Sequence, residues 1–215
     1  TATALAHYER ARELAESSAT ARDRVTALSG IVEAQLKLGD LEAAEAALQP
    51  LVQLAPDDVG TKYLVARTAF VKKDYDAADA SLREVLQVSP SFLPGRLLMG
   101  AVQLELGRLG QAESYISGVI SAAPRNHEAR AILAEIRMRQ GRADDVAAIL
   151  EPILDSASGE IRTLAVRASL QSGQHETTIN FLREQLANNP ENADIQMQLA
   201  AALVVAGDHE EAQAI

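Results

Sequence analysis

The stretch Gly39-Asp40-Leu41-Glu42-Ala43-Ala44 decides the fold, because it recurs along the chain. It returns as Lys73-Asp74-Tyr75-Asp76-Ala77-Ala78 and again as Gly107-Arg108-Leu109-Gly110-Gln111-Ala112. Weaker copies begin at Gly141, Gly173 and Gly207. The starting positions 39, 73, 107, 141, 173 and 207 are separated by 34, 34, 34, 32 and 34 residues. A fixed period of this size is typical of a repeat architecture.

A second series of residues keeps the same register. Prolines follow four of the starting positions at a distance of 17 residues: Pro56, Pro90, Pro124 and Pro190. Between a starting position and its proline, apolar residues recur at helical spacing, and runs of the same kind precede each start. Glycine can end one helix in the left-handed conformation, and proline cannot continue the next. Each unit is therefore predicted to hold two helices, for example Leu41–Leu54 and Tyr75–Val88 after a start, and Leu93–Leu106 and Ala129–Arg139 before one.

A single helix pair of this size cannot bury its apolar face, so the sequence predicts an all-α solenoid of stacked antiparallel pairs. Small residues seven positions before a start would let helices approach closely: Ala66, Gly100, Ala134 and Ala200. Their larger predecessors would fill the core: Val65, Met99, Leu133 and Leu199. Val146 and Thr178 replace an alanine of the repeat, which predicts looser packing there. Pro50 and Pro152 predict a kink inside their helices.

Composition excludes several classes of function. The chain has 47% hydrophobic and 23% charged residues, as soluble folded proteins do, and a net charge of −10. This charge disfavours nucleic acid and anionic lipid as partners. There is no cysteine, and the longest apolar stretch, near Leu199–Ala206, is far shorter than the ~20 residues that span a bilayer.

No catalytic or cofactor motif is present. The sequence contains no phosphate loop, dinucleotide fingerprint or nucleophile elbow. Its four histidines, His7, His127, His175 and His209, have no further ligands at metal-site spacing. We therefore expect a non-catalytic protein without a metal or cofactor.

The 34-residue period, the small residues and the closing proline resemble the tetratricopeptide repeat family from about Val25 to the end. The resemblance implies an α–α superhelix. Residues 1–24 would then be the second helix of a truncated preceding repeat, 25–158 repeats one to four, and 159–215 repeat five and a partial sixth. The fourth unit is two residues short, so we expect either a hinge near 155–160 or a tolerated deletion in a surface turn. The chain is interpreted as a fragment of a longer protein.

In this family, residues ten, six and three positions before a start line a concave groove. Carried onto this sequence, the resemblance implies a binding surface formed by Tyr63, Arg67, Phe70, Leu97, Ala101, Leu104, Glu135, Met138 and Arg167. That composition suits an amphipathic helix or an extended peptide with apolar anchors. The alternative is that these residues pack against neighbouring first helices. The Lys and Asn pair by which some family members clamp chaperone carboxylates is absent, which disfavours a cytosolic co-chaperone.

Several segments also resemble the tetratricopeptide-repeat lipoproteins of bacterial PEP-CTERM/exosortase systems, namely 63–70, 73–78, 97–103, 111–116, 129–134 and 149–154. This narrower resemblance implies a periplasmic scaffold of protein sorting and exopolysaccharide production, anchored by a lipidated Cys upstream of Thr1. A cytosolic adaptor or regulatory domain of a larger protein, and a scaffold of an exopolysaccharide secretion complex, remain as alternatives. The sequence leaves the partner and the oligomeric state open.

Overall fold

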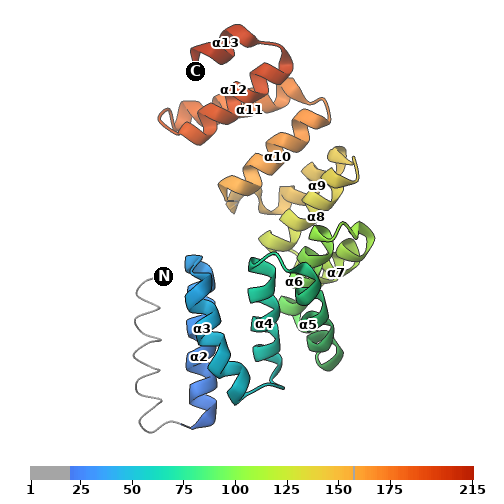
Figure 1. The fold of residues 1–215 in the computed structure, drawn as a ribbon. Helices are drawn as coiled ribbons and strands as arrows, with labels where there is room; N and C mark the ends of the chain where they lie inside the picture. The colour runs from blue at the N-terminus through green and yellow to red at the C-terminus, as the bar shows by residue number, and fades with distance from the viewer. Residues whose placement is uncertain (1–19, 157) are drawn as a thin grey trace. The chain divides into compact units, whose positions relative to one another are not determined.

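The computed structural model describes residues 20–156 and 158–215, and there it is built of helices (Figure 1). The chain falls into two compact units, of which unit 1 ends at Tyr115 and unit 2 begins at Ile116. In order, the elements are α2 (Ala21–Leu38), α3 (Leu41–Leu54), α4 (Val59–Val71), α5 (Tyr75–Val88), α6 (Leu93–Glu105), α7 (Leu109–Ala122), α8 (His127–Arg139), the 3₁₀ turn η1 (Ala143–Asp145), α9 (Val146–Leu150), the 3₁₀ segment η2 (Glu151–Ser156), α10 (Gly159–Gln171), α11 (His175–Asn188), α12 (Ala193–Ala206) and α13 (His209–Ala214).

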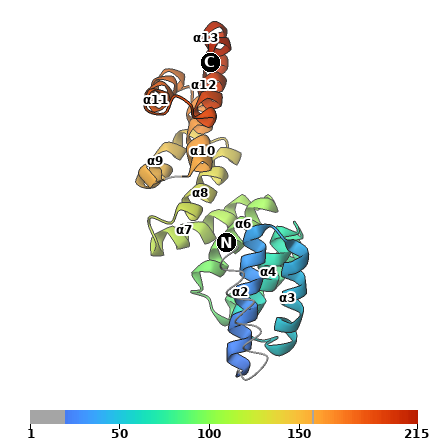
Figure 2. The ribbon, with the colours of Figure 1, turned by 90° about the vertical axis from the view of Figure 1, so that its left-hand side faces the viewer.

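Each unit is a stack of antiparallel helix pairs, as the period predicts. In unit 1 α2 packs on α3 and α4 on α5, and in unit 2 α11 packs on α12 (Figures 1 and 2). Of the residues 1–24 expected to form the second helix of a preceding repeat, 1–19 lie outside the described residues, and 21–24 are the start of α2. The hinge proposed near 155–160 stays a prediction.

The repeated starting position is the turn that reverses the chain within each pair. Gly39 has φ 77° and Lys73, its equivalent, has φ 63°, so both adopt the left-handed conformation. The next residue, Asp40, donates its backbone N–H to the Gln35 carbonyl at 3.0 Å and caps α3 by accepting from Ala43 N at 3.0 Å. One short motif thus satisfies the end of the first helix and the start of the second.

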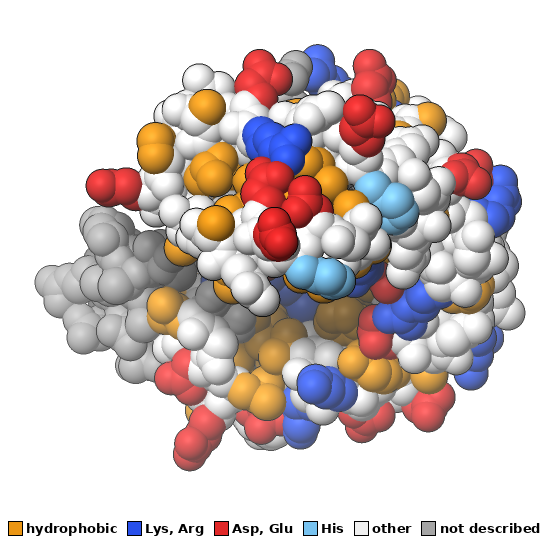
Figure 3. Space-filling view, turned by 90° about the horizontal axis from the view of Figure 1, so that it is seen from above, with side chains coloured by type: hydrophobic (Ala, Val, Ile, Leu, Met, Phe, Trp, Pro, Cys, Tyr) orange, Lys and Arg blue, Asp and Glu red, His pale blue; other side chains and the backbone are white. Residues whose placement is uncertain are grey.

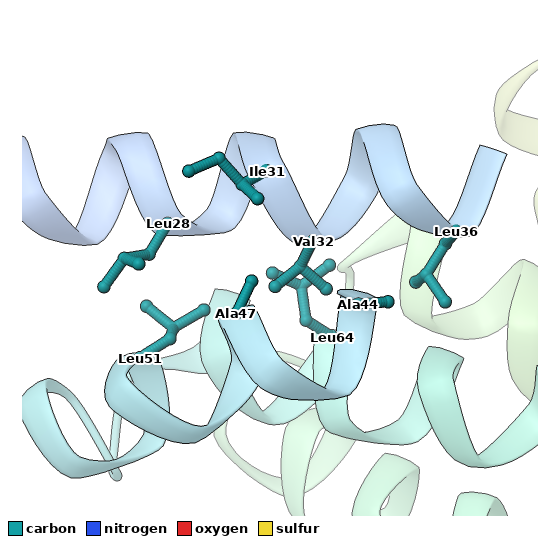
Figure 4. Packing of buried hydrophobic residues seen from close by; sticks show 8 residues of the cluster. All are labelled: Leu28, Ile31, Val32, Leu36, Ala44, Ala47, Leu51 and Leu64. Carbon is teal, nitrogen blue, oxygen red and sulfur yellow. The ribbon is translucent and has the colours of Figure 1, made fainter. Parts of the chain in front are cut away.

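The core of unit 1 begins between α2 and α3. Figure 4 shows Leu28, Val32 and Leu36 of α2 directed toward the alanines and leucine of α3, with Leu64 of α4 beside them. A second cluster joins α4, α5 and α6 through Ala66, Ala78, Leu82, Met99 and Val102. In unit 2, one cluster lies around Leu150 and another around Leu182.

The predicted core positions are confirmed in part. Among the small residues, Ala66, Gly100 and Ala134 are buried, whereas Ala200 is only half-buried. Among the larger ones, Met99 and Leu199 are 1% and 2% exposed. The prediction is wrong for Val65 and Leu133, which are half-buried, because Leu64 and Ile136 fill the core of their helices instead.

The fourth repeat departs from helical regularity in its second half. Its second helix is divided into η1, α9 and η2, and Pro152 lies in the second of the 3₁₀ segments. Pro50, at the same place in the first repeat, lies inside the continuous helix α3. The two substituted positions, Val146 and Thr178, are buried, with exposed fractions of 0% and 5%. The irregularity of the fourth repeat is therefore one of the backbone and does not expose the core.

One buried carboxylate ties three elements of unit 1 together. Asp79 of α5, 8% exposed, accepts from Gln103 Nε2 of α6 at 2.7 Å, from Arg83 Nη2 at 2.9 Å and from Arg108 Nη1 at 3.2 Å. Burial by itself raises the pKa of the Asp79 carboxyl, but the hydrogen bonds from Arg83 and Gln103 outweigh it, so the pKa lies below its ordinary value. Asp79 is therefore charged at neutral pH and holds the turn before α7.

Candidate functional site

The predicted binding residues lie on first helices of both units. In unit 1, Tyr63, Arg67 and Phe70 are on α4, while Leu97, Ala101 and Leu104 are on α6. In unit 2, Glu135 and Met138 are on α8 and Arg167 is on α10. The structure brings only some of them to a common cavity.

Unit 1 contains a cavity of about 330 Å³ between three first helices. It is lined by Ser29 and Glu33 of α2, by Gly60, Tyr63, Leu64 and Arg67 of α4, and by Phe92 and Pro94 at the start of α6. Tyr63 and Arg67 were predicted as site residues, and Ser29 and Glu33 occupy the same columns one repeat earlier. Phe70, Leu97, Ala101 and Leu104 do not line this cavity.

The residues nearest to each turn are used for packing in several repeats. Phe70 packs against the core of unit 1 and Met138 against a core of unit 2. Leu104 is only 5% exposed. In α12, by contrast, the same face is open: Met197 is 68% and Val204 50% exposed. Figure 3, in which α12 and α13 lie nearest the viewer, shows hydrophobic side chains among acidic ones at this end of unit 2.

Phe92 is the lining residue that the repeat columns miss. It occupies the cap position before α6, where the corresponding residues Asp58, Asn126 and Asn192 each accept a backbone hydrogen bond. Phe92 makes no such side-chain bond. Replacing a good cap by a residue that cannot accept costs about 1 kcal/mol. Pro94 reduces the need for a cap, because it has no N–H in the first turn.

Two contacts fix the Phe92 ring at the cavity. It lies edge-on to Tyr63, with ring centroids 5.3 Å apart and planes at 89°. The ring also lies close to the buried Gly95, where a Cβ would be 2.8 Å from Phe92 Cδ1. Glycine at this place therefore lets the ring settle against α6. The result is a preformed aromatic wall.

The cavity also holds one acidic and one basic side chain. Glu33 and Arg67 are half-buried, and neither forms a hydrogen bond or ion pair with another residue of the described chain. An apolar wall with a few polar groups is the usual make-up of a ligand site.

The same two residue types occupy the same column in unit 2, with another outcome. Glu135 and Arg167 each stand six positions before a turn, as Glu33 and Arg67 do. There Arg167 Nη2 donates to Glu135 Oε2 at 2.5 Å, and Arg139 Nε donates to Glu135 Oε1 at 3.3 Å. In unit 2 these two predicted site residues therefore form an ion pair with each other.

Over the described ranges, no three His, Asp or Glu side chains gather as a metal site would require. Nor is any helix of those ranges long and apolar enough to cross a membrane.

Stacked helix pairs with a left-handed turn at each repeat define a helical-repeat protein. Models of the tetratricopeptide repeat match residues 29–91, 97–160 and 169–215, so the chain belongs to the tetratricopeptide repeat family. It is therefore a scaffold for protein–protein interaction, of a family that is typically non-catalytic. No curated protein matches it.

Solved structures share the fold at low sequence identity. A thermophilic tetratricopeptide repeat protein of Thermus thermophilus is 19% identical, with 86% of this chain and 100% of that chain covered and a TM-score of 0.67. A tetratricopeptide repeat protein of Parabacteroides merdae is 15% identical, with 89% and 77% covered and a TM-score of 0.68. The pilF protein of Pseudomonas aeruginosa is 13% identical, with 90% and 89% covered and a TM-score of 0.72.

Proposed function

We propose that the chain binds a peptide or helical segment of a partner protein on the first-helix face, with the unit 1 cavity as the anchoring site. The observation that carries this proposal is Phe92. A position that serves as a helix cap in other repeats is given to an aromatic ring, and this ring forms the cavity wall with Tyr63. Departures from local rules of this kind gather at functional sites.

The size and lining of the cavity suit a side chain rather than a large ligand. A volume of about 330 Å³ is at the small end of the ~300–1,000 Å³ found for small-molecule sites. Aromatic walls beside polar groups are typical of the pockets that receive anchor residues in protein interfaces. An apolar side chain of the partner would pack against the wall formed by Tyr63 and Phe92.

The other predicted residues belong to the proposal as supporting contacts. Leu97 and Ala101 are half-buried on α6 and keep some surface for a ligand. In unit 2, a ligand that used Glu135 or Arg167 would first have to open the bond between them. We therefore assign the anchoring role to unit 1.

Phe92→Asn tests the anchor without sacrificing the fold. The new side chain would restore a cap of about 1 kcal/mol, which offsets part of the lost packing of the half-buried ring, whose aromatic pair contributes about 0.5–1.5 kcal/mol beyond its buried area. The variant should therefore stay folded, while the anchor is removed. Peptides selected from a random displayed library on the wild-type chain should bind the variant at least about tenfold more weakly.

Phe181→Ala is the matched control, because Phe181 is a 48% exposed phenylalanine of α11, outside the cavity. It should bind the selected peptides like the wild type. Unchanged binding of the Phe92→Asn variant would place the peptide site elsewhere and refute the proposal.

We also propose that the scaffold serves in the bacterial envelope, in protein sorting or exopolysaccharide production. The support is the resemblance of segments such as 63–70 and 149–154 to the lipoproteins of PEP-CTERM/exosortase systems. The alternatives are a cytosolic adaptor domain and a scaffold of an exopolysaccharide secretion complex. The sequence at the N-terminus of the full-length protein tests the placement. A signal peptide ending in a lipidation Cys would support the envelope, and a plain start followed by a catalytic domain would contradict it.

A further inference from the structure

The charged residues of the unit 1 cavity differ from their unit 2 counterparts in pairing. Glu33 on α2 and Arg67 on α4 are column equivalents of Glu135 on α8 and Arg167 on α10. The unit 2 pair is bonded at 2.5 Å. The unit 1 pair lines the cavity instead, and within the described ranges it has no partner of opposite charge.

Glu33 and Arg67 can each form an ion pair or hydrogen bond with a ligand in the cavity, because neither forms one with another described residue. Half-buried charged groups lose some hydration and gain when a ligand supplies the missing partner. Glu33 and Arg67 come from different helices and bear opposite charges, so their sum in the cavity is zero. A purely anionic ligand would meet Glu33, and a purely cationic one would meet Arg67. The ligand that satisfies both carries both signs.

We infer that the cavity selects a partner segment in which an apolar side chain is flanked by one basic and one acidic residue. The apolar side chain packs against the wall formed by Tyr63 and Phe92. The basic residue faces Glu33 on the α2 side, and the acidic residue faces Arg67 on the α4 side. The inference rests on the proposed peptide-binding function and adds to it the charge order of the ligand.

Selection of displayed random peptides on the full chain tests this charge order. Wild-type selections should be enriched in Lys or Arg on one flank of an apolar anchor and in Asp or Glu on the other. Glu33→Gln should lose only the basic preference, and Arg67→Gln only the acidic one. The matched variants Glu135→Gln and Arg167→Gln should retain both.

A second measurement uses the wild-type chain alone and so does not depend on variants that fold. A synthetic peptide of the most enriched sequence is compared with versions in which either charged flank is changed to Gln. Each change should weaken binding about three- to tenfold at low salt, and high salt should reduce the difference.

The possible failures are distinct. If apolar anchors are enriched and lost in Phe92→Asn, but no charges are selected, the charge order is refuted and the proposed function stands. If Glu135→Gln or Arg167→Gln removes the preference, the charged residues of the peptide are bound by unit 2 and the inference is wrong. If no peptide is enriched at all, the proposed function fails and the charge order fails with it.

Discussion

Replacing Asp79 by alanine should destabilise unit 1 through one particular neighbour. The Asp79 carboxylate, 8% exposed, is bonded by Arg83, Arg108 and Gln103. The side chains of Arg83 and Arg108 are 64% and 41% exposed, so both can turn to water when the carboxylate is removed. Gln103 is 1% exposed and cannot.

The expected magnitude follows from that buried amide. A hydrogen bond to a charged group contributes about 1.5–3 kcal/mol, and a buried donor left without its acceptor costs about 1–3 kcal/mol. These are two descriptions of the same loss, so Asp79→Ala should lower the free energy of unfolding by about 2–3 kcal/mol. Gln103 Nε2 keeps a weak contact to Met99 Sδ at 3.2 Å, which places the value below the upper limit.

Urea unfolding followed by circular dichroism measures the loss. Arg83→Ala is the control, because it removes a bond to the same carboxylate from an exposed side chain and should lie within experimental error of the wild type. Combining Asp79→Ala with Gln103→Leu should recover part of the stability, since it removes the unsatisfied donor together with its acceptor. If Asp79→Ala proved no more harmful than the control, or if the double variant were less stable than Asp79→Ala, the assignment of the cost to Gln103 would be refuted.

The remaining predictions concern pH, turns and core. Because the folded-state pKa of Asp79 is depressed, its contribution should be complete above the unfolded-state value and lost as pH falls through the folded value; acid titration of the wild type should show this loss and that of Asp79→Asn should not. Gly107 has φ 72°, so Gly107→Ala should lower the free energy of unfolding by about 1 kcal/mol in thermal melts. Gly110 lies in α7 with open space around it, so Gly110→Ala should raise the free energy of unfolding by about 0.5–1 kcal/mol in the same experiment. Leu51→Ala, at 0% exposed, should cost about 2–5 kcal/mol in urea unfolding, and its neighbour Val52→Ala, at 37% exposed, far less.

The repeat period predicts the helices well because each boundary is determined by its own local chemistry. The helices predicted as Leu41–Leu54 and Tyr75–Val88 have those bounds in the structure. An aspartate cap precedes each of them and a proline follows, so neither end depends on distant contacts. Where the signal is weaker, the prediction shifts: α8 begins at His127 rather than Ala129, because Asn126 is its cap.

The 3₁₀ segments on both sides of α9 are not predictable in this way. The fourth repeat lacks two residues and the closing proline, which indicates an irregularity without specifying its form. The structure shows that both ends of the second helix change, and not only the turn after it.

The candidate site is predictable to the extent that it follows the repeat columns. Tyr63 and Arg67 are found because their spacing places them on one helix face. Phe92 is missed because it belongs to the cap and not to a column, although a signal was present: a phenylalanine where Asp58, Asn126 and Asn192 stand. Whether the Glu and Arg at equivalent repeat positions form an ion pair depends on their rotamers and on the distance between the helices. Neither can be predicted from the repeat positions alone.

Two residue differences between the repeats nevertheless accompany the difference between Glu33 and Arg67, which are not bonded to each other, and Glu135 and Arg167, which are. Tyr63 corresponds to Thr163, and Phe92 to Asn192. In unit 2 these small polar residues are bonded within the scaffold: Thr163 Oγ1 accepts from Gln198 Nε2 at 2.7 Å, and Asn192 caps α12. In unit 1 two aromatic rings stand in their place and form a wall of the cavity that Glu33 and Arg67 also line. The exchange of small polar residues for rings thus accompanies the change from a bonded Glu135–Arg167 pair to two charged side chains that line a cavity, and the proposed peptide site depends on this difference.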